Sequence, residues 1–252
     1  MRGELRCKTQ ADLFDGNTEN ANAESCEEKA ENESVYSADL AELFELSVEA
    51  YSAALHARMS CLPIAKEISR YIEKVKNSGS IHAVGGVPLT SPQSEVDRIN
   101  ADKAAFDRGD PDVLTVLRAA GKVRHEIHRL LGLLRFSPDS NGFYTARCAP
   151  DHLILPALAE HFTLRFGETP WIIIDEKREI CLLREKGAEA VLVSLSSQNQ
   201  KTRPTENCTA DFWEDLWRLY HRSINNESRK NPGLQLQFMP RRYQKYLPEM
   251  KN

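Results

Sequence analysis

The sequence lacks the common signatures of hydrolases, nucleotidases and dehydrogenases. It contains no G-x-S-x-G, no Walker loop, no H-E-x-x-H and no G-x-G-x-x-G. Its six cysteines lie far apart and form no C-x-x-C pair, which argues against a zinc ribbon or a disulfide framework and favours reduced thiols. No internal repeat is visible. Local motifs therefore do not reveal a reaction.

Long apolar runs are also missing. No stretch approaches the length needed to cross a bilayer, and Met1 to Gln10 lacks the apolar segment of a signal peptide. A chain of 252 residues with 41% hydrophobic content can nevertheless bury a sizeable core. We expect a globular, cytoplasmic protein without membrane contact.

Basic side chains are scarce at the start of the chain. The first fifty residues hold four basic and thirteen acidic side chains, so the net charge of -4 leaves an excess of about five positive charges on the remainder. Binding of a polyanion depends on a local patch rather than on overall charge. The body of the protein remains a candidate for such binding.

Composition divides the chain into four regions. Residues 15–34 contain almost no large apolar side chains and cannot offset the entropy of ordering. Apolar residues at helical spacing predict one helix from Ser37 to about Arg58 and another from Ile64 to Asn77. The expected regions are a disordered acidic leader (1–36), a helical hairpin (37–77), a linker or loop with a short helix from Val96 to Phe106 (78–109), and a core domain (110–252).

The stretch from Asp110 to Phe136 gives the clearest helix signal. Asp110 suits the N-cap and Pro111 the first helical position. Apolar residues from Val113 to Leu131 follow one stripe, and a cationic row occupies the opposite face. That row contains Arg118, Lys122, His125 and Arg129, flanked by Arg124 and His128.

Short strands and further helices follow. We expect about five mostly antiparallel strands, at 133–136, 143–148, 171–175, 180–184 and 190–195, and a helix beginning at Pro150 or Asp151. Thr209 begins a long helix that ends at Asn231-Pro232-Gly233, after which Leu234, Leu236 and Phe238 alternate. The predicted class is α+β, with the N-terminal helical hairpin and the long C-terminal helix packed on the sheet.

Two kinds of catalytic site can be considered. His125, His128, Cys148, His152 and His161 would bind a metal only if the fold gathered them, and Cys148-x-x-x-His152 spans a strand-to-helix junction, so we predict no metal and no cofactor. Asp151, His152 and Asp175 are candidates for an acid or base beside Lys177 and Arg178. Asp151 is more simply an N-cap.

Basic residues beside aromatic and amide side chains favour nucleic-acid binding, because cations hold phosphates and rings stack on bases. The alternative is a solvated helix face and a tail that straps the sheet. The candidate nucleic-acid-binding residues are Arg118, Lys122, Arg124, His125, His128, Arg129, Arg135, Lys177, Arg178, Arg229, Lys230, Gln235, Arg241, Arg242, Tyr243 and Lys245.

Four stretches resemble a bacterial family labelled as DNA metabolism or DNA repair proteins: 121–136, 149–166, 170–178 and 225–249. The similarity spans roughly Leu40 to Glu249. The core domain of that family has no known function. Its members are encoded beside a radical-SAM protein, and similar domains are fused to uracil-DNA glycosylases. The resemblance therefore implies DNA and a radical-SAM protein as partners.

These observations lead to three hypotheses. The first is an accessory protein that binds DNA and cooperates with a radical-SAM or glycosylase partner. The second is an enzyme acting on a nucleobase or nucleotide by acid-base chemistry, and the third is a protein-binding scaffold without nucleic-acid contact. The sequence does not decide between enzyme and binding protein.

Overall fold

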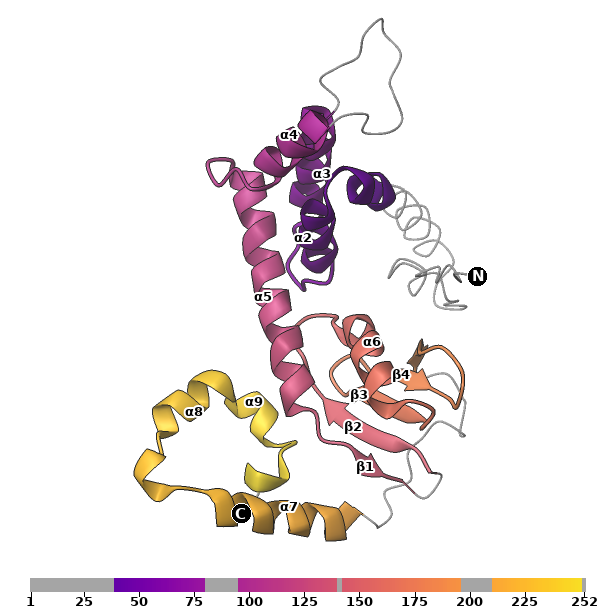
Figure 1. Ribbon diagram of the computed structural model, residues 1–252, viewed down its shortest axis with the longest axis vertical. Helices are drawn as coiled ribbons and strands as arrows, with labels where there is room; N and C mark the ends of the chain where they lie inside the picture. The colour runs from indigo at the N-terminus through magenta and orange to yellow at the C-terminus, as the bar shows by residue number, and fades with distance from the viewer. Residues whose placement is uncertain (1–38, 80–94, 140–141, 196–209, 251–252) are drawn as a thin grey trace, which may run out of the picture. The chain divides into compact units, whose positions relative to one another are not determined.

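The computed structural model describes residues 39–79, 95–139, 142–195 and 210–250 (Figure 1). They form two compact units, one ending at His125 and the other beginning at Glu126. The division falls inside helix α5 (Pro111–Leu133) rather than before Asp110. The predicted leader (1–36) and residues 80–94 of the predicted linker lie outside the described residues. None of the described helices is long and apolar enough to cross a membrane.

The first unit is helical. Residues 39–46 are helical, and α2 (Val48–Arg58), α3 (Ala65–Gly79) and α4 (Glu95–Ala105) follow before the first part of α5. The helix predicted from Ser37 to Arg58 is interrupted at Ser47, whose side chain accepts a hydrogen bond from the Ala50 amide at 3.0 Å and caps α2. Buried side chains from every one of these helices, including Leu43, Ala54, Tyr71 and Ala101, form its core.

Charged pairs join α3 to the start of α5. Asp110 caps α5 as predicted, because its Oδ1 accepts hydrogen bonds from the amides of Asp112 (2.8 Å) and Val113 (3.3 Å). Lys74 donates to Asp110 and Asp112 at 2.6 and 2.8 Å, and Arg70 binds both oxygens of Asp112. These bonds fix the first turn of α5 against α3.

The second unit contains a five-stranded sheet in the order β1-β2-β3-β4-β5. Strands β2 (Tyr144–Cys148) and β3 (Trp171–Asp175) pair in parallel because α6 (Leu155–Phe166) crosses between them. The other pairings, with β1 (Ser137–Pro138), β4 (Ile180–Arg184) and β5 (Val191–Ser194), are antiparallel. The predicted α+β class with a mostly antiparallel sheet of about five strands is confirmed.

Strand β3 lies in the middle of the core, and all five of its residues are buried. Trp171 packs on Phe162 of α6 with ring centres 6.2 Å apart. On the other face, Ile172 and Ile174 cluster with Cys181 and Leu183 of β4. Because both faces of β3 are buried, its residues are almost all apolar instead of alternating between apolar and polar.

The chain ends in a series of helices: α7 (Ala210–Ile224), the 3₁₀ turn η3 (Glu227–Arg229), α8 (Pro232–Phe238), α9 (Arg241–Gln244) and η4 (Pro248–Met250) (Figure 1). A long C-terminal helix is present, but it ends at Ile224 rather than at Asn231-Pro232-Gly233. The alternating residues from Leu234 to Phe238, however, lie in α8. Asn231 caps that helix by accepting from the Leu234 amide at 3.0 Å, and Pro232 takes its first position.

Two further boundaries differ from prediction. The strand expected at 133–136 is replaced by the last residue of α5 and a two-residue β1, so the hairpin with β2 has a short first strand. The helix expected to begin at Pro150 or Asp151 begins at Leu155, with Ile154 at the N-cap and no side-chain cap bond.

Candidate functional site

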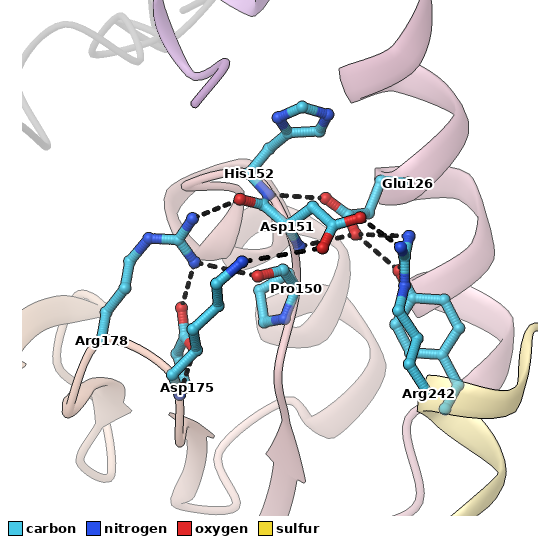
Figure 2. A network of polar contacts seen from close by, with 9 residues as sticks. Glu126, Pro150, Asp151, His152, Asp175, Arg178 and Arg242 are labelled. Carbon is cyan, nitrogen blue, oxygen red and sulfur yellow. Dashed lines mark hydrogen bonds and ion pairs between the residues drawn. The ribbon is translucent and has the colours of Figure 1, made fainter. Parts of the chain in front are cut away.

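Glu126 of α5 is a buried carboxylate surrounded by donors. Its side chain accepts hydrogen bonds from the backbone amides of Asp151 (2.9 Å) and His152 (2.8 Å), from the Tyr243 hydroxyl (2.5 Å) and from Arg242 Nη2 (3.1 Å) (Figure 2). Its exposed fraction is 2%. Four donors offset the cost of burying a polar group. Glu126 thereby joins α5, the segment after β2, and α9.

Arg178 holds the same segment from the other side. Its guanidinium donates to the carbonyl oxygens of Pro150 (3.1 Å) and Asp151 (2.5 Å) and to Asp175 Oδ2 (2.8 Å). Asp175 is fully buried at the end of β3, and its Oδ1 accepts from the Lys177 amide at 2.9 Å. Glu126 therefore binds the backbone amides of Asp151 and His152, while Arg178 binds the carbonyl oxygens of Pro150 and Asp151. We call residues 150–152 the clamped segment.

The clamped segment lies at the carboxyl ends of parallel strands β2 and β3, which is where ligands bind in many sheets of this kind. Its exposed functional group is the Asp151 carboxylate. Lys177 Nζ lies 3.6 Å from one oxygen of that carboxylate, and Arg242 forms an ion pair with the other (Figure 2). All three side chains are about half exposed. The cluster offers solvent one carboxylate between two cations.

The predicted acid-base residues do not form one reacting set. The His152 ring points away from the carboxylates of Asp151 and Glu126 (Figure 2). Burial lowers the pKa of His152, against the opposing effect of Glu126 and Asp151. Asp175 has both oxygens engaged inside the protein. The three residues are neighbours, but only Asp151 presents its carboxylate outward.

Buried thiols add no further chemistry here. Cys148 and Cys181 are free and buried, and burial raises the pKa of Cys181 to about 11 and that of Cys148 as well. Cys148 Sγ lies 3.4 Å from the Ile174 carbonyl oxygen. Within the described parts of the chain, no three His, Cys, Asp or Glu side chains are grouped so that they could hold a metal ion.

Many of the predicted nucleic-acid-binding cations are paired with carboxylates. Arg242 binds Glu126 and Asp151, Arg135 binds Glu249 at 2.8 Å, and Lys245 binds Glu176 at 3.2 Å. Lys177, Arg178 and Lys230 are also paired. Tyr243 is buried, and the Gln235 amide donates to Met250. The structure therefore leaves these groups few free bonds for phosphates or bases.

The cations of α5 are different. Arg118, Lys122 and Arg124 are exposed, Arg129 is half-buried, and none of the four forms an ion pair with another described residue. Exposed His125 places Nδ1 2.8 Å from the Gly121 carbonyl oxygen, and His128 is exposed on the next turn. Arg229 and Arg241 in the C-terminal helices are likewise exposed and unpaired within the described regions.

Residues 96–249 match the family model of a domain of unknown function, DUF4130. The chain belongs to the DUF4130 family. The matched DUF4130 region begins in α4, whereas the sequence resemblance was expected to start near Leu40, so residues 39–79 lie outside it. Searches of curated proteins and of solved structures gave no match. All candidate residues named above fall within the DUF4130 region.

Glu126 had no role assigned from sequence, although it is the centre of the clamp. The sequence does indicate that Glu126 is buried, because a helical wheel places it beside the apolar stripe, between Val123 and Leu130, both of which are buried. A carboxylate at such a position needs buried donors. The identity of those donors could not be predicted, since Tyr243 and Arg242 are more than a hundred residues away along the chain.

Proposed function

We propose that this protein binds DNA through the exposed cationic face of α5 and acts as an accessory protein in DNA metabolism or repair. The observation that supports this most strongly is the set Arg118, Lys122 and Arg124, which are exposed and form no ion pair with a described residue. Two helical turns, about 11 Å, contain all three. Arg118 and Lys122 lie in one row on the helix, and Arg124 flanks that row. Duplex DNA presents a phosphate charge about every 3.4 Å along each strand, so cations spaced in this way lie within reach of several phosphates.

The proposal does not depend on the C-terminal cations. Arg242 and Lys245 already bind carboxylates, and an arginine that is paired in this way has less to gain from a phosphate. The α5 cations have no such competitor among the described residues. They contribute sequence-independent affinity, which suits a protein that presents DNA to another protein.

Reversal of the three α5 charges tests the proposal. We expect Arg118→Glu/Lys122→Glu/Arg124→Glu to weaken binding of a labelled duplex by at least about tenfold in fluorescence anisotropy, because three phosphate contacts become repulsive. The matched control is Lys66→Glu/Lys103→Glu/Arg108→Glu, which changes the net charge equally at exposed, unpaired positions of the same unit. If both variants weaken DNA binding equally, the loss comes from the change in net charge and not from the α5 surface, which would contradict the proposal.

A protein partner, such as the radical-SAM or glycosylase protein that the resemblance implies, is supported by a different surface. Phe212, Leu216, Leu219 and Tyr220 recur along one side of α7, and all four are exposed. Leu234, Leu236 and Phe238 of α8 are exposed as well. Apolar groups concentrated in this way mark interaction sites more often than isolated ones do.

A single substitution on α7 tests this part of the proposal. We expect Leu219→Glu to abolish co-elution with the radical-SAM protein in gel filtration, because it buries a charge in an apolar contact. The control is Leu164→Glu on α6, where the leucine is 77% exposed. If both variants co-elute like the unmodified protein, α7 is not the docking face.

A further inference from the structure

A hollow of about 490 Å³ lies in the second unit, between the end of α5, the start of β2, α6 and α7. Its size falls in the range of small-molecule sites, roughly 300–1,000 Å³. Five aromatic residues line it: Phe136, Tyr144, Phe162, Phe166 and Trp217. The hollow does not include the clamped segment or the exposed cations of α5.

The aromatic wall is built from rings in mutual contact. Phe136 and Phe166 have ring centres 4.7 Å apart, and Tyr144 and Phe166 have centres 5.4 Å apart. Tyr144 and Trp217 keep about a third of their surface exposed, 37% and 38%. The wall therefore offers flat π surfaces that a planar ligand can stack on without the cost of unpacking the core.

Trp217 is held in place by polar contacts. Its Nε1 donates to Glu249 at 2.9 Å, and the same carboxylate accepts from Arg135 Nη2 at 2.8 Å. The Arg135 guanidinium carbon lies 5.5 Å from the centre of the Trp217 ring. An aromatic group fixed in this way is preorganised, so that less side-chain entropy is lost when a ligand binds.

The hollow also carries positive charge. Arg165 of α6 lines it, is exposed, and forms no ion pair with any residue that the structure describes. Arg135 lines it too, and its Nε is buried without a hydrogen-bond partner among the described atoms. A purely apolar ligand would gain nothing from an unpaired arginine. Aromatic surfaces beside an unpaired cation suit a planar ligand with a negative charge.

We propose that this hollow binds one unstacked nucleotide, with its base against the exposed rings of Tyr144 and Trp217 and its phosphate at Arg165. Stacking on aromatic rings together with an arginine contact is how proteins hold single-stranded nucleic acid. The inference deepens the proposed function and rests on it for the choice of a nucleic acid as the ligand. The nucleotide can come from a strand or from free mononucleotide, which share this chemistry.

The test uses the full chain with two probes. Anisotropy measures binding of fluorescein-labelled octathymidylate, and calorimetry measures binding of thymidine monophosphate. We expect Trp217→Ala and Arg165→Glu each to weaken binding about tenfold, and Trp217→Phe to retain most of it because a ring remains. Lys186→Glu is the charge-matched control, since Lys186 is exposed, unpaired within the described regions and outside the hollow.

The outcomes are distinct. Arg165 is a surface residue, so Arg165→Glu decides the matter even if Trp217→Ala impairs folding. The inference is overturned if Arg165→Glu weakens binding no more than Lys186→Glu does, or if the unmodified protein binds neither probe. Comparable affinity per nucleotide for both probes assigns a free nucleotide, and much tighter binding of the oligonucleotide assigns a strand.

The α5 charge variant separates the two proposals. It should leave binding of thymidine monophosphate unchanged while it weakens binding of duplex DNA. Loss of duplex binding with no effect of Trp217→Ala or Arg165→Glu on either probe would sink only the nucleotide site. If Trp217→Ala and Arg165→Glu weaken binding of the probes while the α5 charge variant still binds duplex DNA, only the proposed α5 surface is contradicted.

Discussion

At the scale of single residues, Glu126 is a buried carboxylate that links three segments of the second unit. It binds two backbone amides of the clamped segment and two side chains of α9. Removal of one member of a buried charged group leaves the others without partners, which costs more than the group itself contributes. The position of Asp151 thus depends on a residue 25 positions earlier in the chain.

We predict that Glu126→Ala lowers the free energy of unfolding by about 3–5 kcal/mol, because the two backbone amides, the Tyr243 hydroxyl and Arg242 lose their acceptor. Urea denaturation measures the change. Tyr243→Phe is the control, since it removes only one of the donors and should cost about 1 kcal/mol. If Glu126→Ala costs no more than Tyr243→Phe, the clamp is not a structural centre.

Asp110 and Asp151 show when a helix cap can be predicted from the sequence. Asp110 was correctly predicted to cap a helix because Pro111 and Asp112 follow it and agree with that role. Asp151 has the same local appearance but does not cap α6. Its carboxylate binds Lys177 and Arg242, which are distant in sequence, so no local pattern could show the difference.

At the scale of elements, the contact between α3 and the start of α5 depends on pH. The pKa of Asp112 falls from 3.8 to about 2, first because of the hydrogen bond from Arg70 and then that from Lys74. Because the pKa of Asp112 is lower in the folded state than in the unfolded state, its ion pairs stabilise the fold above pH 3.8. That stabilisation is lost as the pH falls toward 2. Both partners keep their charge throughout this range.

We therefore predict that the difference in thermal stability between the unmodified protein and Asp112→Asn is constant above about pH 5 and disappears near pH 2. Thermal unfolding followed by circular dichroism from pH 2 to 7 measures it. Glu67→Gln is the control, because its contact with Arg70 is longer, at 3.5 Å, and exposed. A difference that grows on acidification would contradict the assignment.

Elements with a clear period were predictable, and short ones were not. α3, β3 and β4 follow their helical or strand patterns to within about two residues, and α7 begins where predicted but ends at Ile224, before the predicted stop at Asn231. The alternation from Leu234 to Phe238 was misleading, because the strand-like spacing fits within a seven-residue helix that begins at an Asn-Pro pair. Asn231-Pro232 does not only follow a helix, as its sequence predicts, but supplies the cap and the first helical position of α8.

At the scale of the whole molecule, pairing of charges decides which cations can bind a polyanion. Composition gave the positive excess outside the acidic first fifty residues, but not its distribution. Lys245, Arg135 and Arg242 find carboxylates 69, 114 and 116 positions away. Such pairs depend on the tertiary fold. The sequence predicted the cationic row on α5, but only the structure showed that its arginines and Lys122 form no ion pair with a described residue.

The salt dependence of DNA binding tests the central claim most directly. Each phosphate contact contributes about -0.9 to the slope of log K against log salt concentration. If Arg118, Lys122 and Arg124 each contact a phosphate, replacing all three by alanine makes the slope shallower by about 2.7. An unchanged slope, with the protein still folded, would contradict DNA binding through α5.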